Sequence, residues 1–115
     1  MEPIKILLVD DEEELVTTLS QRMSMRNFGT NVAFNGEQAL KVVKDEIPDV
    51  VVLDLKMPGI DGMEACRRIR KNFSGPVLFM TAQDDDFDEV AALEIGADDY
   101  IVKPVEPRVL LARLR

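Results

Sequence analysis

Val50-Val51-Val52-Leu53-Asp54 is the stretch that decides the fold of this 115-residue chain. Its first four residues are all apolar, which is typical of a strand buried on both faces, because a strand with one face in water alternates apolar and polar residues. Residues 77–80 form another wholly apolar run, and residues 4–9 are apolar except for Lys5. Since Asp54 closes the first run, the sequence also predicts a carboxylate at the end of a buried strand.

Amphipathic helical patterns separate these runs. Helices are expected at about 12–26, 36–46, 63–71 and 84–95, with a last one from Pro107, and two further strands at 30–34 and 99–102. Strands that alternate with helices predict a parallel sheet covered on both faces. We therefore expect one α/β domain over residues 1–115, a doubly wound, five-stranded, flavodoxin-like (βα)5 fold with strand order 2-1-3-4-5.

Composition excludes several kinds of site. The chain has one cysteine, Cys66, and no histidine, so it cannot build a multi-thiolate metal site, a His-ligated zinc site or a Ser-His or Cys-His catalytic pair. Its net charge of −8 makes it a poor nucleic-acid binder by itself. No apolar run approaches the roughly 20 residues of a membrane span, and no signal peptide is recognisable. A cytoplasmic location without membrane contact is expected.

Polar residues gather where the predicted strands end. Asp10 and Asp11 follow the first strand and Asp54 ends the third, which the predicted order places beside it. Carboxylates this close must hold protons or bind a cation, and a ligand set of oxygens suits Mg²⁺ or Ca²⁺, with Mg²⁺ the better fit. An alternative for the acidic pair alone is helix capping. Thr81 and Lys103 follow the fourth and fifth strands and could bind a phosphoryl group at the same edge.

These residues form a known signature. The pair Asp10-Asp11, the stretch 52–59 (Val-Leu-Asp-Leu-Lys-Met-Pro-Gly), Thr81-Ala82 and Lys103-Pro104 closely resemble the receiver domains of two-component response regulators. The stretches 96–100 (Gly-Ala-Asp-Asp-Tyr) and 110–114 (Leu-Leu-Ala-Arg-Leu) look most like the OmpR/PhoB subfamily of transcription factors.

The resemblance implies a role for each site residue. Asp54 would accept a phosphoryl group from a sensor histidine kinase, and Lys103 would bind a phosphoryl oxygen. Mg²⁺ would be held by Asp11, Asp54 and the backbone carbonyl of Lys56, with Asp10 acting through a water. Thr81 and Tyr100 would form the switch, and the loop-shaping residues would be Pro58, Gly59 and Pro104, the last after a cis peptide bond. Such a domain is a phosphoacceptor switch, not an enzyme acting on other substrates.

The resemblance also implies an output surface. Activation would form a homodimer through the fourth helix, fifth strand and fifth helix, with Val90, Leu93 and Ala112 as an apolar patch and Asp98 with Arg113 as an ion pair between chains. Glu89 and Val109 depart from the subfamily pattern, which removes both halves of another expected ion pair. DNA binding would require a separate output domain outside these 115 residues.

Other interpretations fit less of the sequence. A receiver fold that signals without phosphorylation, or an engineered or hybrid receiver, remains open. An aspartyl phosphatase of the haloacid dehalogenase type would need an acid where Lys56 stands. A flavodoxin-like cofactor carrier would need a phosphate-binding loop at 10–14, where this chain has five acidic residues.

Overall fold

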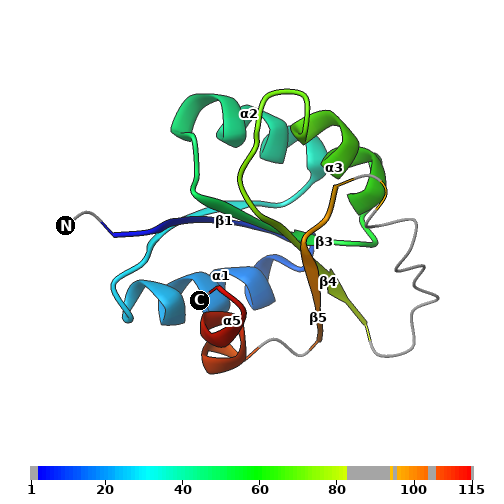
Figure 1. Ribbon diagram of the computed structural model, residues 1–115. Helices are drawn as coiled ribbons and strands as arrows, with labels where there is room; N and C mark the ends of the chain where they lie inside the picture. Colours follow the sequence, from blue (N-terminus) through cyan, green and yellow to red (C-terminus); the bar gives the residue numbers. More distant parts are fainter. Residues whose placement is uncertain (1–2, 83–93, 95, 104–105, 115) are drawn as a thin grey trace.

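The computed structural model describes residues 3–82, 94, 96–103 and 106–114 (Figure 1). Along the chain they form β1 (Lys5–Val9), α1 (Glu13–Ser24), β2 (Gly29–Ala33), α2 (Gly36–Glu46), β3 (Val50–Asp54), α3 (Gly62–Ile69), β4 (Val77–Thr81), β5 (Asp99–Val102) and α5 (Pro107–Arg113). The five strands form one parallel sheet in the order β2-β1-β3-β4-β5. The predicted fold class and strand order are therefore confirmed, whereas the helix predicted at 84–95 falls largely outside the described residues.

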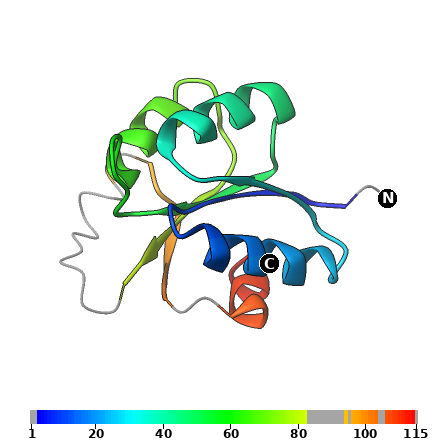
Figure 2. The same ribbon diagram turned by 180° about the vertical axis from the view of Figure 1, so that it is seen from behind.

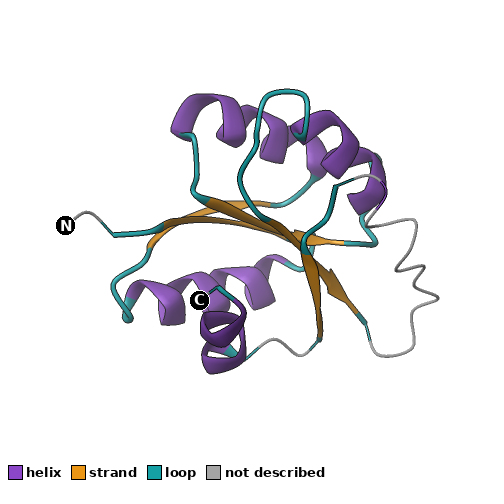
Figure 3. Cartoon of the chain, viewed as in Figure 1, coloured by secondary structure: helices purple, strands orange, loops and turns teal. Residues whose placement is uncertain are grey.

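Helices cover both faces of the sheet. α2 and α3 lie on one side and α1 and α5 on the other, as the front and back views show (Figures 1 and 2) and as the colouring by secondary structure makes plain (Figure 3). Because strand side chains alternate, Leu7 and Val9 enter the core under α2 and α3, while Ile6 and Leu8 enter the core under α1 and α5. No helix of the described part of the chain is long and apolar enough to cross a membrane.

Local sequence sets where two helices begin. The Asn35 side chain accepts a hydrogen bond from the Gln38 amide at 2.9 Å, and the Gln38 side chain accepts one from the Phe34 amide at 2.8 Å. These two bonds resemble a capping box, which satisfies backbone donors that the helix itself leaves free. Asp61 caps α3 in a simpler way, by accepting from the Glu64 amide. Both caps lie at the carboxyl edge of the sheet, so they fix the loops that surround the candidate site.

Ile47, which ends α2, has a backbone conformation that is costly for its side chain. It is a β-branched residue with φ of 48°, and 71% of it is exposed. Left-handed geometry costs a residue with a Cβ about 1–2 kcal/mol, and glycine pays none of it. We expect Ile47→Gly to raise the free energy of unfolding by about 0.5–1 kcal/mol after the larger entropy of the unfolded glycine chain is subtracted.

Urea denaturation measures this change as a higher midpoint. Asn27→Gly is the matched control, because Asn27 also has positive φ, at 69°, but asparagine tolerates that region. Its midpoint should move less. A midpoint that falls for Ile47→Gly would show that its side chain makes a stabilising contact that outweighs the backbone cost.

Candidate functional site

The three predicted carboxylates do meet at one point of the carboxyl edge. Asp10 and Asp54 are buried, with 0% and 4% of their surfaces exposed, and Asp11 is exposed. One oxygen from each lies within 4.8 Å of the others. The sheet brings them together because β1 and β3 are neighbours, with Val9 paired to Leu53 just before the acidic residues.

Lys103 lies among these carboxylates. Its Nζ is 2.9 Å from Asp10 Oδ2, 3.2 Å from Asp54 Oδ1 and 3.4 Å from Glu12 Oε1. Burial alone would lower the pKa of Lys103, but its hydrogen bond to Asp10 and the charges of Asp10 and Asp54 outweigh burial and raise that pKa above its ordinary value. Lys103 is therefore positively charged at neutral pH and partly neutralises the acidic cluster.

Asp54 has an unusual affinity for protons in the metal-free site. Burial and, after it, the charge of Asp10 raise the pKa of Asp54 from 3.8 to about 7, although Lys103 acts in the opposite direction. One lysine therefore does not balance two buried carboxylates. A second positive charge is needed before both can be ionised at low cost.

The carboxylate oxygens of the cluster form a suitable ligand set for a cation. Asp10 Oδ1 accepts a hydrogen bond from the Glu12 amide at 2.9 Å. Asp10 Oδ2 is fully buried, and its partner is the Lys103 ammonium group at 2.9 Å, which Asp54 shares. Three carboxylates whose oxygens lie within 4.8 Å of one another, with no nitrogen or sulfur ligand among them, fit a hard divalent cation such as Mg²⁺ or Ca²⁺.

The remaining predicted site residues lie around this cluster. Thr81, the last residue of β4, is 3% exposed, and its carbonyl accepts a hydrogen bond from the Lys103 amide at 2.7 Å. Tyr100 is half-buried and packs against the core under α2 and α3. Pro58 and Gly59 border a groove that also includes Asp11. Gly59 has φ of 78°, a conformation that favours glycine.

The predicted dimer residues are only partly placed. Val90, Leu93 and Glu89 lie outside the described residues, as does Pro104 with its predicted cis bond. Val109 and Ala112 are exposed on α5. Within one chain the Arg113 guanidinium lies 3.3 Å from Asp99, and the Asp98 carboxylate is bound by Arg70. An ion pair of Asp98 with Arg113 between two chains stays a prediction.

Two contacts were not expected from the sequence. Glu12 joins Lys103 at the edge of the acidic cluster, where the run 10–14 gave no sign of which of its acids would do so. Arg70 makes a network of bonds at the opposite edge of the sheet. A basic residue at the end of a helix is common, so no signal in the sequence marked this one out.

Known proteins resemble the chain over nearly its whole length. The response regulator receiver domain family matches residues 6–115. The transcriptional regulatory protein AfsQ1 of Streptomyces coelicolor is 46% identical over 96% of this chain and 49% of its own length. The alkaline phosphatase synthesis transcriptional regulatory protein PhoP of Bacillus subtilis is 45% identical, over 96% and 47%. The chain thus spans about half the length of the curated relatives it matches.

Solved structures agree with these relatives. The BeF3-activated N-terminal receiver domain of Klebsiella pneumoniae RstA is 40% identical, with a TM-score of 0.87 over 96% of this chain and 95% of that one. A response regulator of Burkholderia pseudomallei, solved with a phosphorylated aspartic acid, a calcium ion and citrate, is 26% identical, with a TM-score of 0.89 over 97% and 66%. The chain belongs to the response regulator receiver domains of two-component systems, and its curated relatives are transcriptional regulators of the OmpR/PhoB family.

Proposed function

We propose that this receiver accepts a phosphoryl group on Asp54 from the phosphohistidine of a sensor kinase, in a reaction that requires Mg²⁺. The observation that carries the proposal is the position of the Asp54 carboxylate. It ends a buried strand, lies beside two other carboxylates and is 3.2 Å from a charged lysine. This arrangement supplies positioning and positive charge, which are the two contributions that phosphoryl transfer takes from a protein.

The transfer step needs little else from the protein. An Asp54 carboxylate oxygen attacks the phosphorus atom, a new O–P bond forms, and the P–N bond to the kinase histidine breaks. The nitrogen keeps the electron pair of that bond and takes a proton from solvent. Lys103 already lies between Asp10 and Asp54, so its ammonium group can follow the negative charge onto a phosphoryl oxygen.

The metal would be held by the chain's own oxygens. Asp11 and Asp54, with the backbone carbonyl of Lys56, would be direct ligands, and Asp10 would contribute through a water molecule. When bound, Mg²⁺ would neutralise the cluster and the transferring phosphoryl oxygens. The meeting of the Asp10, Asp11 and Asp54 oxygens within 4.8 Å of one another supports this assignment. So does the Burkholderia pseudomallei relative, which was solved with a phosphorylated aspartic acid and a calcium ion.

The output would follow from the added charge. Phosphorylation adds about −1.5 to −2 charge and three acceptor oxygens beside Thr81, whose hydroxyl can then turn toward them, with Tyr100 moving inward. The surface of the fourth helix, β5 and α5 would then form a homodimer and control a separate DNA-binding domain. The domain would act as a phosphoacceptor switch that catalyses only its own phosphorylation and slow dephosphorylation.

Intact-mass spectrometry tests the proposal. With Mg²⁺ and acetyl phosphate, the wild type should gain one phosphoryl group, and Asp54→Asn should gain none. Asp45→Asn, which removes an exposed carboxylate on α2, should label like the wild type. A wild type that gains no label with Mg²⁺, or Asp54→Asn that labels fully, contradicts the proposal and favours a receiver that signals without phosphorylation.

A further inference from the structure

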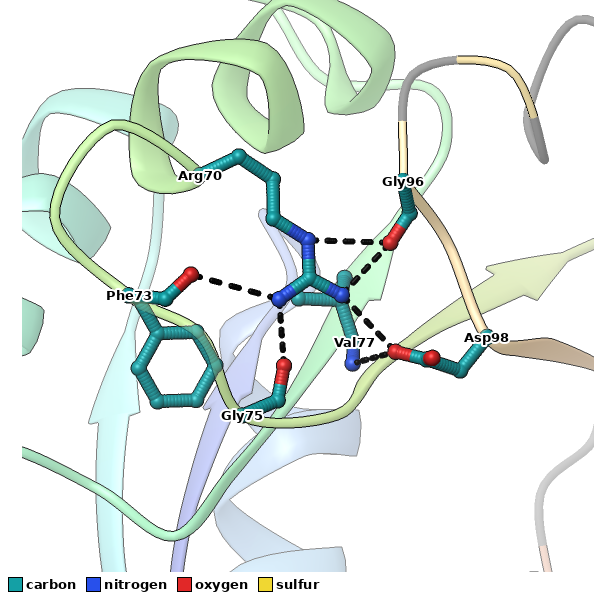
Figure 4. A network of polar contacts seen from close by, with 6 residues as sticks. All are labelled: Arg70, Phe73, Gly75, Val77, Gly96 and Asp98. Carbon is teal, nitrogen blue, oxygen red and sulfur yellow. Dashed lines mark hydrogen bonds and ion pairs between the residues drawn. The ribbon is translucent and has the colours of Figure 1, made fainter.

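Arg70, the residue that follows α3, uses its whole guanidinium group at the amino edge of the sheet (Figure 4). Nε donates to the Gly96 carbonyl at 2.9 Å, and Nη2 donates to the same carbonyl and to Asp98 Oδ2, the latter at 2.7 Å. Nη1 donates to the carbonyls of Phe73 and Gly75. The five bonds go to four acceptor atoms, because the Gly96 carbonyl accepts two of them, and five is the full donor capacity of an arginine.

These bonds hold the segment that leads into β4 against the segment that leads into β5. Gly75 precedes β4, and Gly96 and Asp98 precede β5. Asp98 Oδ2 also accepts a hydrogen bond from the Val77 amide at 2.9 Å, and the Asp98 amide donates to the Val77 carbonyl at 2.8 Å. Arg70 therefore fixes where β5 begins relative to β4.

The sheet restrains β5 on one side only. β5 is an edge strand of four residues, paired with β4 alone. Its other end carries Lys103, whose ammonium group lies within 3.2 Å of Asp54. Strand residues advance by about 3.3 Å each, so a displacement of β5 along its axis by about a third of a residue, roughly 1 Å, changes the distances from the Lys103 ammonium group to the acidic cluster.

The absence of a side chain at Gly96 leaves space for the Arg70 guanidinium group. Its φ is 105°, and a Cβ built on it would lie 2.9 Å from Arg70 Nε. Any side chain at this position would therefore push on the guanidinium group, so Gly96→Ala disturbs the same network from its acceptor side.

We propose that Arg70 is a positioning residue for phosphoryl transfer, which acts through Asp98 and the register of β5 to place the Lys103 ammonium group at Asp54. The proposal rests on the proposed function, because it assigns Lys103 its role in that reaction. Arg70 touches no reacting atom. It acts from the other end of β5, about 17 Å away along the five residue steps from Asp98 to Lys103.

A double-mutant cycle separates positioning from general destabilisation. Rates of Mg²⁺-dependent labelling by acetyl phosphate are measured for the wild type, Arg70→Met, Lys103→Met and the double variant. Methionine keeps an unbranched side chain and removes the guanidinium group, together with its cation–π contact to the Phe73 ring, whose centroid is 5.9 Å from the guanidinium carbon. Arg67→Met is the matched control, because Arg67 is an exposed arginine of α3 whose ion pair is with Glu64 on the same helix.

Arg70→Met should slow labelling about tenfold in the wild-type background, since small misplacements of a reacting group have effects of this order. In the Lys103→Met background it should change the rate less than about twofold, because an absent ammonium group cannot be misplaced. Gly96→Ala should show the same dependence on Lys103, Arg70→Lys should recover part of the rate, and Arg67→Met should have no effect. Equal slowing in both backgrounds, or slowing by Arg67→Met, would overturn the proposal.

A second readout does not depend on the reaction. The backbone amide of Lys103, bonded to the Thr81 carbonyl, should change its NMR shift in Arg70→Met and keep it in Arg67→Met. An unchanged Lys103 amide in Arg70→Met overturns the positioning role even if no variant labels. A wild type that fails to label, with the shift change present, overturns the phosphoacceptor function and leaves the register role standing.

Discussion

Gly62→Ala is expected to lower the free energy of unfolding by about 3 kcal/mol, which is at the upper end for overpacking. An alanine Cβ at this position would lie 2.3 Å from the backbone oxygen of Asp54 and 2.7 Å from the Cα of Leu55. Both are backbone atoms of the segment that carries the phosphoacceptor, so neither can rotate away. Alanine ordinarily stabilises a helix by about 1 kcal/mol relative to glycine, so the expected sign is the reverse of the usual one.

Chemical denaturation measures this loss, and Gly29→Ala is its control. A Cβ on Gly29 would meet its nearest atom, Lys5 Cγ, at 3.7 Å, which is an ordinary contact. That variant should stay within about 1 kcal/mol of the wild type. If Gly62→Ala proved as stable as Gly29→Ala, α3 would have to approach the end of β3 less closely than described.

Asp54→Asn is expected to stabilise the metal-free protein at pH 8 by about 2 kcal/mol, although it removes a residue of the site. The folded-state pKa of Asp54, about 7, lies above its unfolded value of 3.8. Between those values the folded state binds more protons than the unfolded state, so stability falls as the pH rises from about 4 to about 7. The full pKa shift corresponds to a destabilisation of the wild type by about 4 kcal/mol at pH 8. The variant does not gain all of this, because burying the polar asparagine side chain has a cost of its own.

The pH dependence distinguishes this cause from others. At pH 4 the folded wild type is protonated at Asp54 and its unfolded state is about half protonated, so most of the cost of burying the charge is gone. The cost of burying asparagine then remains, and the variant should be the less stable protein at pH 4. At pH 8 saturating Mg²⁺ should stabilise the wild type more than the variant, because it binds the folded carboxylates. A variant less stable than the wild type at pH 8 without metal would mean that the Lys103 contact outweighs the burial of charge.

Most of the fold could be predicted because the decisive signals are local. The apolar run 50–53 and the helical pattern of 36–46 each identify their own element, and the alternation of elements gives the parallel sheet. The boundaries differ by one or two residues, since terminal turns depend on contacts outside the pattern. β2, for example, begins at Gly29 because its amide bonds to the Ile4 carbonyl, a residue far away in sequence.

The site residues likewise include some that the sequence predicts and others that it does not. Asp10, Asp11, Asp54 and Lys103 end strands, so the sheet topology brings them together, and topology follows from the pattern. The Arg70 network could not be predicted, because its acceptors are three backbone carbonyls and a carboxylate from two separate connections. Backbone carbonyls are present at every residue, and only the folded chain shows which of them an arginine reaches.

The sheet divides the interior into two hydrophobic cores. This division affects how sequences with this fold can diverge in evolution. Leu7 and Ile6 are adjacent in sequence, yet their side chains pack into different cores. Substitutions under α2 and α3 are therefore expected to combine additively with those under α1 and α5, because the two sets of residues belong to separate core clusters. The core on one face of the sheet can therefore change in sequence while the core on the other face keeps its packing. The helices of one face can acquire new surfaces in this way, and the acidic cluster at the carboxyl edge of the sheet is retained.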